Sequence, residues 1–124
     1  MPGYPCPCCG RLVHDQPPGS YLICPVCGWE DDLIQLRWPH RTRGANRSSL
    51  VEAQYSQEVK SACNFCLGVK GCDPDRCWPS DPGFRFIDLD VDNFESLETV
   101  ENEWPKDRTR LYWWRRTFWR GSQP

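Results

Sequence analysis

The most constraining feature of the chain is a five-residue pattern, C-P-x-C-G, that occurs twice, at residues 6–10 and 24–28. We call these two segments the first and the second knuckle. A tight C-x-x-C turn directs two thiolates at one ion, and the glycine that follows adopts a backbone geometry that a side chain would obstruct. Two knuckles brought together by a hairpin complete a tetrahedral Zn²⁺ site. The predicted ligands are Cys6, Cys9, Cys24 and Cys27.

The cysteines have two alternative interpretations, as a disulfide framework or as a redox-active motif. A small secreted domain with nine cysteines can be a disulfide framework. Nine is an odd number, however, and the segment from Met1 to Tyr4 lacks the charged and apolar regions of a signal peptide, so we expect the chain in a reducing cytoplasm. A redox-active C-x-x-C motif is expected once and within a βαβ pattern, whereas the knuckle occurs twice. Zinc is therefore the favoured interpretation.

Cys8 lies in the middle of the first knuckle. Its separation from Cys6 does not give the C-x-x-C spacing of a ligand pair, which Cys6 and Cys9 have. It is either a small space-filling residue, which we favour, or a reactive thiol near the positive charge of the metal.

The region 4–32 reads as a zinc ribbon. A short strand is predicted near residues 11–13 and a second one at 21–23, with strong turn chemistry at 17–20 between them. Strands this short do not persist unaided, so the metal should hold them together. Trp29 follows the second knuckle, where it is expected to shield the metal site.

A helix is predicted over 48–62. Ser49 and Glu52 have the spacing of a capping box, and Leu50, Ala53 and Val59 outline an apolar face.

Four ordered motifs carry a resemblance to a known family. They are Tyr4-Pro5-Cys6-Pro7-Cys8-Cys9-Gly10, then Pro18-Gly19-Ser20-Tyr21, then Ile23-Cys24-Pro25-Val26-Cys27-Gly28-Trp29-Glu30-Asp31-Asp32, then Gly44-Ala45-Asn46-Arg47 with Ser49-Leu50 and Glu52-Ala53. Over residues 4–62 the chain resembles the bacterial cysteine-rich CPCC family. The resemblance implies a small zinc-ribbon-like protein and does not imply a particular activity.

A second cysteine cluster lies in the region 63–79. It can hold a second Zn²⁺, although its spacing is less standard than that of two knuckles, and disulfides or thiols without metal are the alternatives. Its members are Cys63, Cys66, Cys72 and Cys77.

The region 84–120 is predicted to form antiparallel strands with a short acidic helix. Ile87, Leu89 and Val91 alternate with acidic residues, which is typical of a half-buried strand, and 94–102 is the acidic helix. The β-forming segment 110–120 is expected to close the domain. The sequence thus predicts a small α+β zinc-binding domain spanning 1–124, with an N-terminal zinc ribbon, one capped helix and C-terminal strands.

The function predicted from the sequence is binding rather than catalysis. Four thiolate ligands leave no open position for water on zinc, and the chain has no metalloprotease, nucleophile-elbow or nucleotide-binding motif. No apolar run approaches the roughly 18 residues of a membrane span.

Charge is segregated, since eight acidic residues fall within 88–107 and five arginines within 108–120. The acidic stretch and the tryptophan and arginine content suit a protein-binding module, in its sharpest form a bacterial immunity protein or antitoxin that neutralises a basic toxin domain. The predicted partner-binding residues are Asp88, Asp90, Asp92, Glu95 and Glu98, with Glu30, Asp31 and Asp32 as a second surface. The alternative is a nucleic-acid-binding zinc ribbon, based on the arginine-aromatic segment 108–120.

Overall fold

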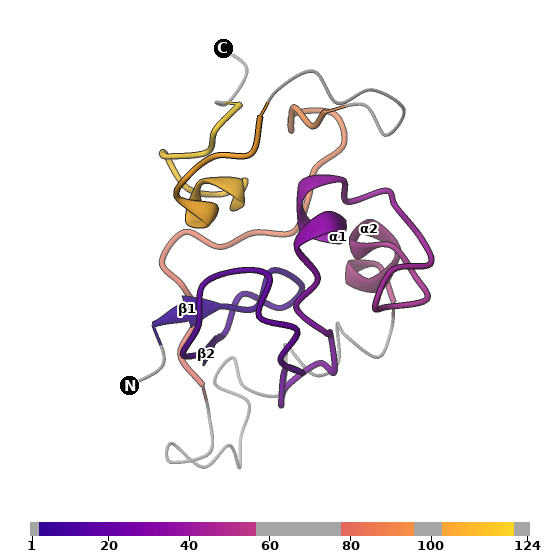
Figure 1. Cartoon of the computed structure of the whole chain (residues 1–124), viewed down its shortest axis with the longest axis vertical. Coiled ribbons are helices and arrows are strands. Elements are labelled where there is room, and N and C mark those ends of the chain that lie inside the picture. The colour runs from indigo at the N-terminus through magenta and orange to yellow at the C-terminus, as the bar shows by residue number, and fades with distance from the viewer. Residues whose placement is uncertain (1–2, 57–77, 96–102, 121–124) are drawn as a thin grey trace.

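The computed structural model describes residues 3–56, 78–95 and 103–120. Its elements, in chain order, are the strands β1 (Tyr4–Pro5) and β2 (Leu12–His14), the helices α1 (Leu33–Arg37) and α2 (Leu50–Gln54), and the 3-10 helix η1 (Arg108–Leu111) (Figure 1). Two short helices and one antiparallel pair of strands confirm the α+β class. Most of the described chain runs in turns and loops, so contacts between side chains position the site.

Each knuckle closes a hairpin of its own. The first lies between β1 and β2, which pair antiparallel with Tyr4 opposite His14. The second lies between residues 21–23 and 29–31, where the Tyr21 amide donates to the Asp31 carbonyl at 3.0 Å and Ile23 bridges to Glu30. The predicted strand near 11–13 is confirmed as β2, but its partner is β1 and not 21–23. A four-residue C-x-x-C turn is itself a hairpin loop, so each knuckle pairs the residues on its two sides.

Both helices begin at side-chain caps. The predicted capping box is confirmed, because the Glu52 amide donates to Ser49 Oγ at 3.1 Å and the Ser49 amide donates to Glu52 Oε1 at 3.0 Å. Helix α2 ends at Gln54, earlier than predicted, and 57–62 lie outside the described residues. Helix α1 was not predicted. Asp32 caps it by accepting from the amides of Ile34 and Gln35 at 2.8 and 3.2 Å.

The predicted strand at 84–92 is wrong. Ile87 is buried, but Leu89 and Val91 are 51% and 47% exposed, so the apolar residues do not share one buried face. The chain turns instead, since the amides of Val91 and Asp92 both donate to the Asp88 carbonyl, at 3.1 and 2.8 Å. Aspartate side chains stabilise such turns by accepting from nearby amides. Here Asp92 Oδ2 accepts from the Asp88 amide at 2.7 Å.

The predicted closing strand at 110–120 is also wrong. This segment forms η1 and then turns, and the described parts of 84–120 contain no strand. The predicted acidic helix lies mostly outside the described residues, which omit 96–102. The segment still closes the domain, because it contributes four large side chains to the same buried core as the knuckle cysteines: Leu111, Tyr112, Trp113 and Phe118.

A buried ion pair anchors the C-terminal region to α1. The fully buried guanidinium of Arg37 contacts the carboxylate of Glu95 at 2.9 Å, and the Glu95 side chain is fully buried as well. Three indole rings surround the same guanidinium, those of Trp38, Trp104 and Trp119, at 4.7, 4.4 and 4.8 Å. A buried charge is tolerated when a partner and aromatic faces replace the lost water. This cluster therefore fixes two distant segments on α1.

Candidate metal centre

The four predicted ligands come together in one cluster. Their Sγ atoms all lie within 4.8 Å of one another, with Cys6 and Cys27 3.7 Å apart and Cys9 and Cys24 3.6 Å apart. A tetrahedral ion with metal–sulfur bonds of about 2.3 Å requires sulfur–sulfur separations of about 3.8 Å. None of the five cysteines in the described residues forms a disulfide. The cluster therefore fits one tetrahedral metal ion.

The knuckle backbones aim these thiols inward. Gly10 and Gly28 have φ angles of 76° and 83°, in the left-handed region that glycine adopts without strain. Their amides close the two turns by donating to the carbonyls of Cys6 and Cys24, at 2.7 and 3.0 Å. In the second knuckle the Val26 amide also donates to Cys24 Sγ at 3.3 Å. The amide groups thus fix the turns and supply positive dipoles near sulfur.

The electrostatics of the cluster favour a cation. Hydrogen bonds from the thiols of Cys24 and Cys6 lower the pKa of Cys27, which stabilises a thiolate there, whereas burial raises the pKa of the Cys6 thiol. Four adjacent thiolates repel one another in a poorly solvated site, and a divalent cation offsets that repulsion. Soft thiolate donors select zinc and similar ions over magnesium or calcium.

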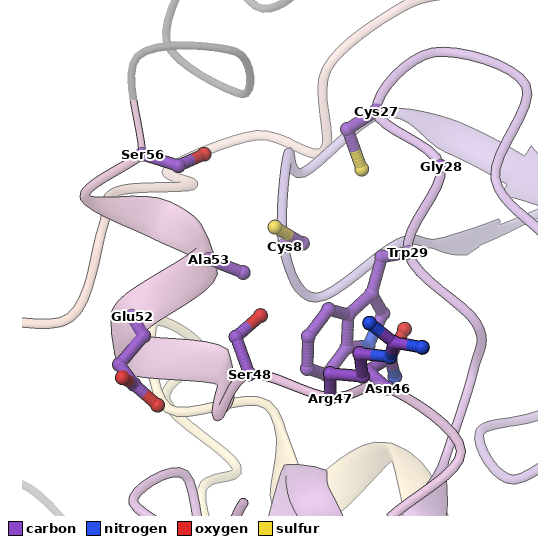
Figure 2. Close-up of a pocket in the computed structure, with 10 residues that line it drawn as sticks. All are labelled: Cys8, Cys27, Gly28, Trp29, Asn46, Arg47, Ser48, Glu52, Ala53 and Ser56. Atoms are coloured by element: carbon purple, nitrogen blue, oxygen red, sulfur yellow. The ribbon is translucent and has the colours of Figure 1, made fainter.

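A cavity of about 290 Å³ opens beside the cluster (Figure 2). Cys8 and Cys27 contribute sulfur to its lining, the indole of Trp29 forms one wall, and Ala53 of α2 faces it. Trp29 is 4% exposed, which agrees with the predicted shielding of the knuckle. In this cavity a metal-ligating sulfur, that of Cys27, faces an open space.

Helix α2 supports the first knuckle through Gln54, which the sequence did not single out. Its side-chain amide donates to the carbonyls of Pro7 and Cys8 at 3.0 and 3.2 Å, and its Oε1 accepts from the Ile87 amide at 2.9 Å. Gln54 is fully buried. A glutamine on the buried face of a helix was the available signal, because such a polar group must satisfy its hydrogen bonds within the protein.

Three of the predicted partner-binding carboxylates lie in the interior. Asp31 Oδ2 accepts from Ser20 Oγ at 2.7 Å, and burial raises the pKa of this carboxyl. Asp32 caps α1 and accepts from the Ala45 amide at 2.8 Å, and Glu95 pairs with Arg37. The prediction that Asp31, Asp32 and Glu95 face a partner is therefore wrong, because each one binds groups within the chain.

The remaining predicted site residues fall into three groups. Asp88 and Asp90 are exposed, Glu30 is half-buried, and Asp92 is half-buried and paired with Arg85. Glu98 lies outside the described residues. So does the predicted second metal site, made of Cys63, Cys66, Cys72 and Cys77.

A four-cysteine cluster between two C-P-x-C-G turns, supported by short helices, defines a small cysteine-rich domain with a metal-capable centre. The family model described as cysteine-rich CPCC matches residues 4–76, more than half of the chain, so the chain belongs to that family. The match extends past residue 62, where the resemblance in the sequence ended, and includes Cys63, Cys66 and Cys72. A comparison with curated proteins found no match. Among the described residues, no helix has the length and apolar character needed to cross a membrane.

Proposed function

We propose that the protein is a non-enzymatic, zinc-stabilised module that binds another protein in the bacterial cytoplasm. The observation that carries the proposal is the cluster of Cys6, Cys9, Cys24 and Cys27 with tetrahedral sulfur spacing. Four thiolates fill the coordination shell of Zn²⁺, whereas a catalytic zinc keeps a position for water or substrate. The ion then stabilises the fold, and residues on the surface of the protein bind the partner. A second Zn²⁺ on Cys63, Cys66, Cys72 and Cys77 belongs to the same proposal.

The loop 88–92 is the surface that best suits a protein partner. It presents the exposed carboxylates of Asp88 and Asp90 beside the exposed apolar side chains of Leu89 and Val91. Its turn is fixed internally, because the Asp90 amide donates to Asp88 Oδ1 at 3.0 Å. A preorganised loop loses little conformational entropy on binding. Apolar anchors flanked by negative charge favour a basic protein surface.

The sharpest form of the proposal is an immunity protein or antitoxin that blocks a basic toxin domain. The acidic loop would meet the basic active surface of the toxin, and complementary charge would speed the encounter.

Nucleic-acid binding through 108–120 receives less support. Tyr112, Trp113 and Phe118 are buried, so these rings are not presented for base stacking.

Affinity capture from a lysate of the encoding bacterium tests the proposal. The bait is the zinc-loaded protein, and the double variant Leu89→Ser/Val91→Ser is compared with Ile34→Ser, which alters another exposed apolar side chain. We expect one basic protein, identified by mass spectrometry. Calorimetry with that purified protein should show at least about tenfold weaker binding for the double variant, because interface anchors contribute more than about 1 kcal/mol each. Ile34→Ser should bind like the wild type.

Three results would contradict the proposal. The first is capture of no protein that depends on the loop. The second is salt-dependent binding of single-stranded oligonucleotides, which would favour the nucleic-acid alternative. The third is purified protein that contains no zinc although no chelator was used.

A further inference from the structure

Cys8 is a fifth thiol at the metal centre and is not one of the four clustered ligands. Its sulfur and that of Cys27 face the same cavity from two different knuckles (Figure 2). A metal ligand and a non-ligand thiol thus border the same open space.

We propose that Cys27 and Cys8 form an oxidation site for small peroxides, in which a Cys27–Cys8 disulfide removes Cys27 from the metal. This inference rests on the metal centre of the proposed function and is independent of the protein partner.

Exposure selects Cys27 as the sulfur that peroxide oxidises. Cys27 is half-buried, whereas the other three ligands are at most 3% exposed. The cavity of about 290 Å³ far exceeds the roughly 30 Å³ that one water molecule occupies in the liquid, so a molecule the size of hydrogen peroxide can enter. A metal-bound cysteine is held as a thiolate, and an accessible thiolate that shares a cavity with a second thiol is the arrangement that reversible thiol oxidation requires.

Position selects Cys8 as the thiol that resolves the oxidised sulfur. Cys6 is also close to Cys27, at 3.7 Å, but it is itself a ligand. A disulfide with Cys6 would remove two ligands, whereas a disulfide with Cys8 removes one. Cys8 is fully buried, and Gln54 fixes the backbone at this position by donating to the Cys8 carbonyl at 3.2 Å.

The chemistry balances with one peroxide. The Cys27 thiolate attacks one peroxide oxygen, the O–O bond breaks, and the sulfur gives two electrons to become a sulfenic acid while hydroxide takes up a proton and leaves as water. The Cys8 sulfur then attacks the Cys27 sulfur, and the Cys8 proton leaves with the sulfenic hydroxyl as a second water. Two thiols and one peroxide thus give one disulfide and two waters. A thiol reductant reverses the change.

Peptide mapping tests the proposal on the full-length, zinc-loaded chain. After hydrogen peroxide treatment and trapping of remaining thiols, trypsin cleavage at Arg11 and Arg37 gives the peptides 1–11 and 12–37. We expect these peptides to be joined by a disulfide that fragmentation assigns to Cys8 and Cys27. Bound zinc should be released in parallel, as measured with a chromogenic chelator, and a thiol reductant should reverse the cross-link.

The matched variants are Cys8→Ala and Cys8→Ser, which keep all four ligands. Their zinc content should equal that of the wild type, the cross-link at Cys27 should be lost, and Cys27 should accumulate as a sulfenic acid that a dimedone probe traps. The wild-type peptide map decides the matter even if neither variant folds.

The proposal is overturned if Cys27 is joined instead to Cys6, Cys9 or Cys24, if peroxide leaves Cys27 unmodified, or if no sulfenic acid forms at Cys27 in Cys8→Ala. Purified protein without zinc would contradict the metal proposal instead, and metal analysis before oxidation separates these failures.

Discussion

Gly10 and Gly28 occupy equivalent positions in the two knuckles, yet their surroundings differ. Both have a positive φ, at 76° and 83°. A Cβ atom on Gly10 would overlap the ring of Phe84, whereas a Cβ on Gly28 would meet no atom within 4 Å. The first glycine is therefore required by backbone conformation and by packing, and the second by backbone conformation alone.

This difference predicts unequal effects of the same substitution. Gly28→Ala should lower the free energy of unfolding by about 1–2 kcal/mol, the cost of a left-handed non-glycine residue. Gly10→Ala should add about 1–3 kcal/mol for overpacking against Phe84. Urea unfolding of the zinc-loaded proteins measures both values. Equal losses would show that Phe84 moves away at little cost and that packing does not require a glycine at position 10.

Helix α2 is short, but it connects the first knuckle to the rest of the core. Five residues do not form a stable helix in isolation, so tertiary contacts must hold it. Its capping box fixes the start, and Gln54 at its end joins the first knuckle to the segment containing Ile87. The helix thereby holds the knuckle in a fixed position against the core.

The substitution Gln54→Leu tests this role at nearly constant side-chain volume. It leaves the carbonyls of Pro7 and Cys8 and the amide of Ile87 buried without the hydrogen bonds that Gln54 supplies. Because a buried unsatisfied group costs about 1–3 kcal/mol, we expect a loss of at least about 3 kcal/mol in urea unfolding. The exposed control Gln16→Leu should change stability by less than about 0.5 kcal/mol. Similar values for the two variants would refute the structural role of Gln54.

The whole molecule has a core that combines the metal cluster with the C-terminal segment. Cys6, Cys9 and Cys24 belong to the same buried cluster as Tyr112. The Tyr112 hydroxyl donates to the Pro5 carbonyl at 3.1 Å, and burial raises the pKa of this phenol well above its usual range, so it stays a neutral donor. A core shared in this way should unfold as one unit.

Removal of zinc by a chelator should therefore unfold both ends of the domain. The free energy of binding of structural Zn²⁺, about 10–16 kcal/mol in zinc-finger peptides, is as large as the total stability of a typical domain. We expect amide hydrogen exchange protection to fall in 4–14 and also in 111–118, and added zinc should restore it. Protection that survives in 111–118 would show that the C-terminal segment is stable without the metal.

The limits of sequence reasoning are clearest in the segment around Ile87. Alternation of Ile87, Leu89 and Val91 predicted a strand, but a strand needs a neighbour with which to pair its backbone. The other predicted strand, at 110–120, forms part of η1 and then turns, and aspartate side chains at 88–92 accept from the nearby amides instead. Period-two alternation therefore did not identify a strand here.

The sequence alone determined the local motifs, which are formed by residues a few positions apart in the chain. Knuckle spacing selected the ligands Cys6, Cys9, Cys24 and Cys27, and the pair Ser49 and Glu52 specified the start of α2. Tertiary structure decided which charges face water. Asp31, Asp32 and Glu95 look like surface acids in the sequence, but their partners lie along the chain at distances that no local pattern encodes, such as the 58 positions between Arg37 and Glu95. Burial of a charge depends on where such a partner arrives in space, and only the folded chain brings the two together.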